Sequence, residues 1–490
     1  MNYRSTRSAD GSFTSAQVIK QGLAADGGLF VPTSLPTLDE TAVVALSKMN
    51  YSERAAYILG LFLTDYSAEE LDEMAKKAYS RRNFGSNPAP LAKLADDYVL
   101  ELWHGPTSAF KDMALQIMPL LLSKSLEKTG EKRNALILVA TSGDTGKAAL
   151  EGYKDTPHIS IQVFYPENGV SNIQKRQMQT QDGKNVSVCA IKGNFDDAQT
   201  GVKNIFADKE IADTLSKKGK FLSSANSINF GRLAPQIVYY ISAYCDLIKN
   251  HQIAYGERIN VCVPTGNFGN ILAAYIAKRM GLPLGKLICA SNSNNVLTDF
   301  FETGVYDRNR PFHATISPSM DILISSNLER LIWFAAGEEE TARLMKLLNS
   351  DGRYQISDSV KAELDKDFAA FWCSESETAD EIRRIYSDFN YLCDTHTAVA
   401  MNAARKYKEK TGDDAKIIIA STASPYKFAP AVCKALGICY TGDEFAAIAS
   451  LSEATSVPVP ENLAKLSGKS PRFTDSIEKS DMAERVLSFS

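Results

Sequence analysis

The chain has 490 residues, of which 44% are apolar and 23% are charged, and its formal net charge at pH 7 is −4. A chain of this length and composition is expected to fold into two or three globular domains rather than to be disordered. The slight negative charge, without a long basic run, argues against binding to nucleic acid or to an anionic membrane, but not against a local basic pocket for a small anion.

Targeting and metal-binding signals are weak. The N-terminus lacks the apolar segment of a secretory signal, and no run of about 18 apolar residues occurs, so we expect a cytoplasmic protein that does not span a membrane. The eight cysteines are scattered without a CxxC pair, which favours reduced, buried thiols. The five histidines have no HxH or HxxxH spacing, so no metal site is predicted.

The first predicted unit covers residues 1–92 and mixes helices with loops. Amphipathic patterns predict helices over 52–63 and 68–80. The segment 85–90, GSNPAP, has the composition of a linker. We therefore expect an N-terminal mixed helical domain that ends near residue 92.

The segment HGPTSAFKDMAL (104–115) predicts the start of a long apolar helix with Lys111 near its first turn. The lysine lies on the buried face, because positions i+3, i+4, i+7 and i+11 from it are the apolar Ala114, Leu115, Met118 and Leu122. Thr107 or Ser108 is the expected N-cap, which would place the ammonium near the positive end of the helix. Burial and the helix dipole lower the pKa of a lysine, whereas the charge of Asp112 acts in the opposite direction.

Beyond this helix the sequence alternates between short apolar segments and predicted helices. Six segments are almost continuously apolar, as strands of a parallel sheet that is buried on both faces should be. They cover residues 134–141, 159–166, 185–193, 258–266, 286–292 and 415–422. A helix predicted over 231–250 separates the first three from the last three.

This order predicts an α/β fold with two open, twisted, mostly parallel sheets flanked by helices, together with the additional N-terminal domain. Residues 131–224 would form a small α/β domain, and residues 93–130 and 225–490 a larger one. We expect the functional site in the cleft between these two domains.

Three loops could carry chemistry, because helix N-termini at the carboxyl ends of strands bind anions. The first loop follows the strand at 134–141 and offers hydroxyls and free N–H groups to a carboxylate or phosphate; it contains Ser142, Gly143, Asp144 and Thr145. Its alternative interpretation is a tight turn in which Asp144 caps the next helix.

The second loop precedes the helix predicted over 231–250 and contains Asn226, Ser227, Asn229 and Arg232. Arg232 could bind an anion through two hydrogen bonds, although an arginine at a helix start more often forms an ordinary ion pair.

The third loop follows the strand at 258–266 and includes Gly266, Asn267, Phe268, Gly269 and Asn270. It matches neither a P-loop nor the full GxGxxG pattern, so ATP and NAD are poorly supported, whereas a phosphate-binding turn is favoured. A buried lysine beside such loops meets the requirement for a Schiff base with pyridoxal phosphate. The alternative is a lysine at a helix end whose head reaches solvent.

Four motifs, HGPTSAFKD, ATSGDTGKAAL, PTGNFGNILA and STASPYKF, together resemble the threonine synthases, which are pyridoxal-phosphate enzymes of the tryptophan-synthase-β fold group, or fold type II. Further segments resemble the same family in the same order, including GLAADGGLFVP, GVSNIQKRQMQT, NSINFGR, SPSMDILISSNLERL and DTHTAVA. The resemblance covers essentially the whole chain.

The resemblance implies roles for the predicted site residues. Lys111 would be the Schiff-base lysine, the loop Gly266–Asn270 would hold the cofactor phosphate, and the hydroxyl of Thr422 would lie near the pyridine nitrogen. The loop Ser142–Thr145 would bind the substrate carboxylate. The group Asn226, Ser227, Asn229 and Arg232 would contact the substrate phosphate or the ring hydroxyl.

The resemblance also implies a reaction, the conversion of O-phospho-L-homoserine and water to L-threonine and phosphate. A related phospholyase, which releases phosphate, ammonia and 2-oxobutyrate, is the nearest alternative, and a serine or threonine dehydratase would leave Arg232 without a use. An alternative from a different functional class is a non-catalytic protein that binds small molecules. The expected partner is the small-molecule substrate, and the chain would act as a monomer or homodimer.

Two positions depart from the family pattern. The family more often has histidine where Ser424 stands and proline where Thr395 stands. Ser424 lies two residues from Thr422, so this departure could alter the wall of the pocket. His396 is retained, and a capping or packing role is at least as compatible with it as a catalytic one.

Overall fold

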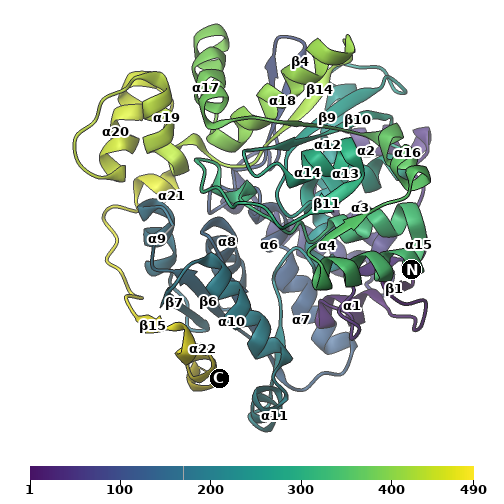
Figure 1. Ribbon diagram of the computed structural model, residues 1–490, viewed down its shortest axis with the longest axis vertical. Coiled ribbons are helices and arrows are strands. Elements are labelled where there is room, and N and C mark those ends of the chain that lie inside the picture. The colour runs from purple at the N-terminus through teal and green to yellow at the C-terminus, as the bar shows by residue number, and fades with distance from the viewer. Residues whose placement is uncertain (169, 490) are drawn as a thin grey trace.

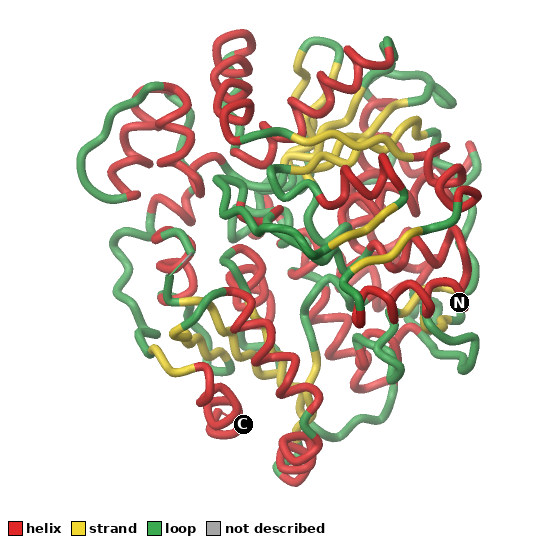
Figure 2. Tube along the Cα trace, viewed as in Figure 1, coloured by secondary structure: helices red, strands yellow, loops and turns green. Residues whose placement is uncertain are grey.

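The protein, described here from a computed structural model over residues 1–168 and 170–489, contains two α/β units and an N-terminal unit (Figure 1). Figure 2 shows the strands of the two α/β units as two separate yellow groups with red helices around each. Within the described residues, no helix is long and apolar enough to cross a membrane, and no three metal-binding side chains lie together.

The larger sheet has the strand order β13-β10-β9-β14-β4-β3. Every neighbouring pair is parallel except β3 and β4, which form an antiparallel hairpin. The strands are β3 (Leu91–Leu94), β4 (Asp97–Glu101), β9 (Ile259–Pro264), β10 (Leu284–Ser291), β13 (Phe368–Trp372) and β14 (Ile417–Ser421). All residues of β9 and β14 are buried, which explains their continuous apolar sequence.

The smaller sheet is entirely parallel and has the order β15-β7-β6-β5-β8. Its strands are β5 (Asn134–Ala140), β6 (Ile159–Pro166), β7 (Val186–Lys192), β8 (Lys220–Ser223) and β15 (Ser476–Glu478). The helices of this unit are α8 (Asp144–Tyr153), α9 (Asn172–Gln179), α10 (Phe195–Ala207), α11 (Lys209–Lys217) and α22 (Met482–Phe489). Of these, α8, α10 and α11 pack on the strands, α9 contacts α8, and α22 contacts α10 and α11.

The remaining elements surround the larger sheet and form the N-terminal unit. The N-terminal unit contains β1 (Tyr3–Ser5), β2 (Phe30–Pro32), α1 (Ser15–Gln21), α2 (Glu40–Ser47), α3 (Tyr51–Phe62), α4 (Ala68–Ala78) and α5 (Arg81–Phe84). The larger unit contains α6 (Asp112–Leu115), α7 (Met118–Lys128), α12 (Phe230–Lys249), α13 (Gly269–Arg279), α14 (Val296–Thr303), β11 (Val305–Asp307), α15 (Leu328–Ser350), β12 (Arg353–Gln355), α16 (Asp358–Asp367), α17 (Glu375–Phe389), α18 (Thr395–Thr411), α19 (Ala429–Leu436), α20 (Glu444–Thr455) and α21 (Glu461–Ala464).

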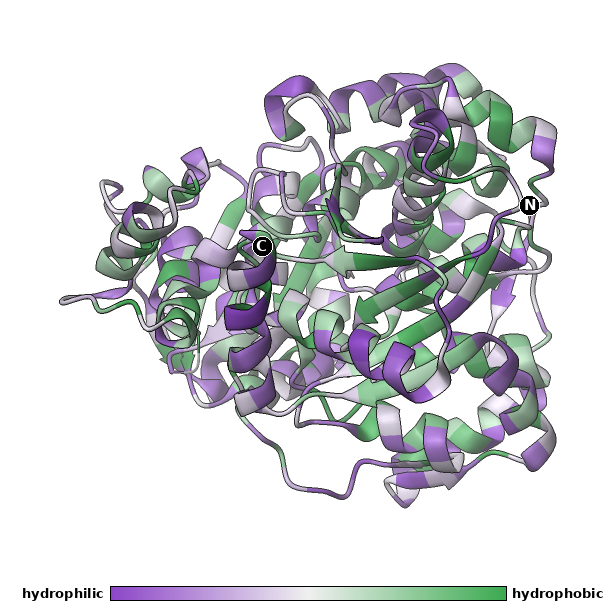
Figure 3. Cartoon of the chain, turned by 90° about the horizontal axis from the view of Figure 1, so that it is seen from above, coloured by the Kyte–Doolittle hydropathy of each residue, from purple (hydrophilic) through white to green (hydrophobic). Residues whose placement is uncertain are grey.

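The helix α12 lies at the centre of the larger unit, and nearly all of its residues are buried. A helix that is apolar around its whole circumference has to be covered on every side, and α12 contacts α2, α3, α6 and α13. Figure 3 shows that apolar residues are concentrated on the inner strands and hydrophilic residues on the peripheral helices.

All six predicted strands and the predicted helix over 231–250 are confirmed, as is their distribution over two mostly parallel sheets. The strands that were not predicted are short or partly exposed, such as β3 and β8, so their sequences lack a continuous apolar run. The strand β15 joins the smaller sheet, although the predicted division assigned residues 225–490 to the larger domain. The domain limits themselves stay a prediction.

The two α/β units are in close contact where α8 crosses α6. A Cβ added at Gly152 of α8 would lie 1.9 Å from the carbonyl oxygen of Leu115 in α6. This position therefore requires glycine. Gly60 in α3 is different, because a Cβ there would meet only Leu71 Cδ1 at 3.5 Å, an ordinary contact.

We predict that Gly152→Ala lowers the free energy of unfolding by about 1–3 kcal/mol through overpacking. The matched change Gly60→Ala should be neutral or stabilise by up to about 1 kcal/mol, because alanine is the better helix former. Thermal melting should show a lower midpoint for Gly152→Ala and an unchanged or higher midpoint for Gly60→Ala. Equal midpoints for the two variants would contradict the close approach of α8 to α6.

Candidate active site

Lys111 and the loop after β5 come together between the two sheets. Lys111 Nζ lies 3.7 Å from Asp144 Oδ2 and donates a hydrogen bond to Ser319 Oγ at 3.4 Å. Asp144 is the first residue of α8, at the carboxyl end of the smaller sheet, and Ser319 belongs to the segment between β11 and α15. Two of the predicted site elements, which are distant in the sequence, therefore meet at one amine.

The predicted buried position of Lys111 is confirmed, but the predicted helix is different. Lys111 is 9% exposed, and the four apolar residues of its stripe are buried. The long helix is divided into α6 and α7, and α6 begins directly after Lys111. The predicted cap is wrong: Ser108 has a φ of 58°, and Thr107 donates both its N–H and its hydroxyl to the Asp112 carboxylate at 2.8 Å.

The environment of Lys111 favours the neutral amine. Burial lowers the pKa of Lys111 to about 8, the nearby Asp144 carboxylate opposes this, and the cations Arg232 and Lys427 lower the pKa further. The predicted opposing charge was Asp112, and the structure assigns this role to Asp144 instead. Burial raises the pKa of Asp112 to about 6, so Asp112 is itself a weakened negative charge.

The loop Ser142–Thr145 forms a tight turn at the start of α8. Gly143 has a φ of 139°, and a Cβ on it would lie 2.5 Å from the Gln174 side chain. The hydroxyl of Thr141 accepts hydrogen bonds from the N–H groups of Gly143 and Gly146, so it shapes the turn. Ser142 and Thr145 remain partly exposed.

Asp144 does not cap α8. Its carboxylate forms an ion pair with Lys427 at 2.5 Å and accepts a hydrogen bond from Gln174 Nε2 at 2.8 Å. Lys427 is fully buried and lies in the turn Pro425–Phe428 after β14. The motif STASPYKF contains Lys427, but sequence reasoning gave this lysine no role. Lys427 is the only charged residue of that motif, and this was the signal that could have found it.

The loop Gly266–Asn270 presents the start of α13. Its carbonyl groups are held from one side, because Ser325 Oγ donates to the Gly266 oxygen and Asn327 donates to the Asn267 oxygen. Phe268 has a φ of 63°, and α13 begins at the next residue. The first N–H groups of such a helix have no partner within the helix and are suited to a phosphate.

The side chain of Asn270 is largely occupied. Its Oδ1 accepts hydrogen bonds from the hydroxyls of Tyr239 and Tyr240 at 2.6 Å each, which fixes α13 to α12. Its Nδ2 is buried without a partner in the described part of the chain. A buried amide of this kind is costly unless a ligand accepts the hydrogen bond.

Arg232 is not an ordinary ion pair. The side chain is 5% exposed, Nη1 donates to the Ala225 oxygen at 2.8 Å, and Nε has no partner. Among the described residues no carboxylate lies within 4 Å of it. Burial lowers the pKa of Arg232 to about 10. A buried, unpaired guanidinium is strongly disfavoured, so this position favours an anionic ligand.

The neighbours of Arg232 divide into two groups. Asn226 and Ser227 are partly exposed, and Ser227 Oγ accepts a hydrogen bond from Asn327. Asn229 differs from the prediction of ligand contact: it is fully buried, caps α12 through the Gly231 N–H, and donates to the Ile19 oxygen at 2.9 Å. Both ends of its amide form hydrogen bonds within the fold.

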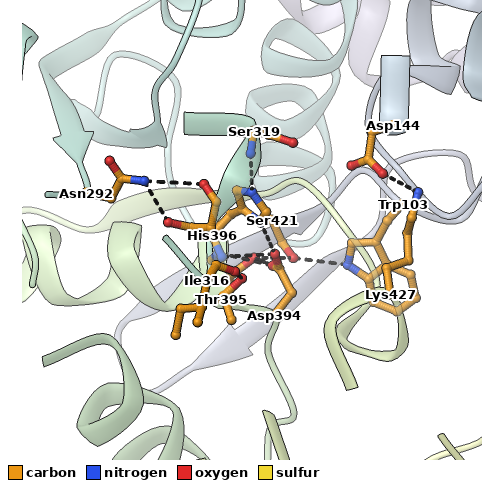
Figure 4. Close-up of polar contacts among 12 residues, drawn as sticks. Trp103, Asp144, Asn292, Ile316, Ser319, Asp394, Thr395, His396, Ser421 and Lys427 are labelled. Carbon is orange, nitrogen blue, oxygen red and sulfur yellow. Dashed lines mark hydrogen bonds and ion pairs between the residues drawn. The ribbon is translucent and has the colours of Figure 1, made fainter. Parts of the chain in front are cut away.

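His396 holds the segment that contains Ser319, as Figure 4 shows. The Ser319 N–H donates to His396 Nε2 at 3.1 Å, so the ring proton is on Nδ1, which donates to Asp394 Oδ2 at 2.7 Å. The hydroxyl of Thr395 also donates to the Ile316 oxygen in this segment. These contacts give His396 a positioning role that sequence reasoning had left open.

Two further observations concern the wall of the site. The carbonyl of Thr422 accepts a hydrogen bond from the Phe110 N–H at 2.8 Å, which fixes the chain beside Lys111 to the end of β14. The Ser424 hydroxyl is buried without a partner in the described residues, and Ser424 borders a cavity of about 150 Å³ with Trp103 and Tyr391.

A larger groove of about 840 Å³ lies elsewhere. It is lined by residues at the starts of β9 and β10, such as Asn260 and Leu284, and therefore lies at the amino edge of the larger sheet. Lys111 and the predicted loops lie at the carboxyl edge, where ligands of open α/β sheets bind. The groove is therefore separate from the candidate active site.

The residues present fit pyridoxal phosphate. The Lys111 amine is buried with a lowered pKa, the start of α13 is suited to its phosphate, and the unpartnered Nδ2 of Asn270 and guanidinium of Arg232 are donors without acceptors. This combination of one reactive amine and several anion-binding groups is what the cofactor requires.

Comparison with known proteins supports this interpretation. Three family models match: "Threonine synthase N terminus" over residues 2–79, "Pyridoxal-phosphate dependent enzyme" over 98–423, and "Threonine synthase, C-terminal" over 397–486. The crystal structure of pyridoxal-phosphate-bound threonine synthase from Brucella melitensis is 36% identical, with a TM-score of 0.88 over 100% of this chain and 99% of that one.

Curated relatives agree with the family models. The chain is 37% identical to threonine synthase of Saccharomyces cerevisiae over 89% of each protein. It is 44% identical to human threonine synthase-like 1 over 86% of this chain, and the match spans 58% of the human protein. The predicted fold and cofactor class are thereby confirmed. The chain belongs to the threonine synthase family of pyridoxal-phosphate-dependent enzymes.

Proposed function

We propose that the protein is a threonine synthase that converts O-phospho-L-homoserine and water to L-threonine and phosphate. The observation that carries this proposal is the buried Arg232, which has no carboxylate partner among the described residues and lies close enough to lower the pKa of Lys111. A substrate with a phosphate group supplies the anion that this guanidinium needs.

Several residues are suited to hold the cofactor. Lys111 would bind its aldehyde covalently, the N–H groups at the start of α13 would bind its phosphate, and the hydroxyl of Thr422 would lie near the ring nitrogen. When bound, pyridoxal phosphate supplies an electron sink that stabilises negative charge on the substrate carbon beside the amino group.

The Lys111 amine is suited to proton transfer at Cα. Its pKa of about 8 lies near physiological pH, so the neutral and charged forms are both populated, as an acid–base group requires. The amine is oriented from two sides, by the Asp144 carboxylate and by the Ser319 hydroxyl. His396 keeps Ser319 in this position through the backbone N–H.

The substrate's two anionic groups have separate candidate sites. The turn Ser142–Thr145 offers backbone N–H groups and partly exposed hydroxyls to the α-carboxylate. Arg232, with the partly exposed Asn226 and Ser227, is the candidate site for the phosphate that leaves from Cγ. A serine or threonine dehydratase has no use for this second anion site. The phospholyase alternative shares it and differs only in the product.

A product assay separates these functions. With O-phospho-L-homoserine as the substrate, we expect equal amounts of phosphate and L-threonine. A phosphate assay and amino-acid chromatography measure the two products. Phosphate together with 2-oxobutyrate and ammonia, but without threonine, would overturn the proposal in favour of the phospholyase. Release of neither product would favour a non-catalytic binder.

Removal of the reactive amine should abolish cofactor attachment. After addition of pyridoxal phosphate and reduction with borohydride, we expect a pyridoxyl group on the peptide that contains Lys111, detected by mass spectrometry. The Lys111→Ala variant should show no such attachment and no activity. The matched variant Lys124→Ala removes a lysine of α7 that pairs with Glu70 and Glu127 at the surface, and should retain both.

Removal of the guanidinium should weaken substrate binding. We predict that Arg232→Met lowers kcat/KM for O-phospho-L-homoserine by about 10- to 100-fold, which corresponds to the loss of a charged hydrogen-bond donor worth about 1.5–3 kcal/mol. Steady-state kinetics measure the change. The control Arg279→Met removes an exposed arginine that bonds to Tyr275, and should leave kcat/KM unchanged. An unaltered Arg232→Met enzyme would show that the phosphate binds elsewhere.

A further inference from the structure

We propose that Lys427 is a positioning residue of the active site that holds the Asp144 carboxylate away from Lys111, so that the Lys111 amine stays free to react. This inference rests on the proposed use of Lys111 as the reactive amine. It assigns a role to the second buried lysine of the site.

The contacts of Lys427 join three parts of the site. Its side chain is completely buried in the turn after β14 of the larger sheet. Its Nζ lies 2.5 Å from Oδ1 of Asp144, which is the first residue of α8 beside the smaller sheet. The same Nζ donates a hydrogen bond to the carbonyl oxygen of Thr107 at 3.2 Å. Thr107 lies four residues before Lys111. Lys427 therefore connects both sheets to the segment that carries the reactive amine (Figure 4).

The two oxygens of Asp144 serve different partners. Oδ1 accepts hydrogen bonds from Lys427 at 2.5 Å and from Gln174 Nε2 at 2.8 Å. Oδ2 faces Lys111 at 3.7 Å, which is too long for a normal hydrogen bond. The carboxylate thus forms a contact ion pair with Lys427 and only a looser interaction with Lys111. The position of Asp144 is set by the cation that does not react.

The other charges around Lys111 come from different elements. Arg232 on α12 and Lys427 both disfavour its ammonium form, whereas Asp144 on α8 favours it. His396 on α18 accepts a hydrogen bond from the Ser319 N–H, and the Ser319 hydroxyl in turn contacts Lys111. Asp112, the next residue, directs its carboxylate toward Thr107. Among these groups, Asp144 is the one whose distance to Lys111 depends on Lys427.

When Lys427 is removed, we therefore expect the Asp144 carboxylate to form a contact ion pair with Lys111. Without its contact cation, the buried carboxylate needs another cation, and Lys111 is the one already 3.7 Å away. The closer carboxylate and the loss of the positive charge of Lys427 both favour the ammonium form. The pH at which the Lys111 amine becomes neutral should consequently rise, and the fraction of reactive amine at pH 8 should fall.

Competitive labelling tests this directly on the full-length protein from which bound cofactor has been removed. Acetic anhydride modifies neutral amines, and mass spectrometry of the Lys111 peptide gives the extent of modification from pH 6 to 11. We expect Lys427→Met to move the midpoint upward by at least one pH unit, which is a tenfold loss of reactive amine below the midpoint. Lys427→Arg, which keeps the charge, should lie closer to the unchanged protein.

Two controls separate this role from a general loss of structure. Lys147 is a half-buried lysine on α8 that pairs with Glu151, and its labelling midpoint should not move in Lys427→Met. In the background of Asp144→Asn, the further change Lys427→Met should shift the Lys111 midpoint by less than half as much, because no carboxylate is left to move.

An unchanged Lys111 midpoint in Lys427→Met would overturn the proposal, and so would an equal shift in the Asp144→Asn background. A shift of Lys147 together with Lys111 would also count against it, because it would indicate that α8 as a whole has moved. The labelling needs neither substrate nor turnover. A protein that releases 2-oxobutyrate instead of threonine would still give the expected midpoints, so failure of the proposed function is recognised separately by the product assay.

Discussion

The ion pair between the buried Asp144 carboxylate and Lys427 is the interaction on which the arrangement of the site depends. The carboxylate comes from the first turn of α8, beside the smaller sheet, and its contact cation comes from the turn after β14 of the larger sheet. A carboxylate without water is tolerated only where cations and hydrogen-bond donors replace its hydration. The two sheets must therefore lie together for Asp144 to be buried at all. The environment of Lys111 therefore depends on how the two α/β units pack against each other.

The N-terminal unit helps to hold the loop before α12 in place. Arg330, which is completely buried, donates to the Phe30 oxygen in β2 and to the Ile228 oxygen in the loop before α12. Asn229 in that loop caps α12 and donates to the end of α1. The loop before Arg232 is thus fixed to the N-terminal unit by hydrogen bonds from the Arg330 and Asn229 side chains to backbone carbonyl groups. A unit that lies away from Lys111 therefore still contacts the loop that leads to Arg232.

Sequence patterns predicted the local features and missed those that depend on distant contacts. The six apolar strands and the buried face of Lys111 follow from periodicity over a few residues, and both are confirmed. The pairing of Asp144 with Lys427 joins segments that are far apart in the chain, and no periodicity reports it. The predicted cap at Thr107 or Ser108 was wrong because α6 begins only at Asp112, whose carboxylate accepts the N–H and the hydroxyl of Thr107. Asn229 was predicted to contact a ligand because a buried cap and a binding amide look the same in sequence.

The strand β15 has a consequence for how the protein is made. It covers the outer edge of β7, but the four other strands of that sheet are complete at Ser223, long before residues 476–478 are synthesised. During translation the edge of β7 therefore stays open while the larger unit is produced. An open, apolar strand edge is a surface on which other chains can pair. The smaller sheet can therefore cover this edge only after the C-terminal segment that contains β15 has been synthesised.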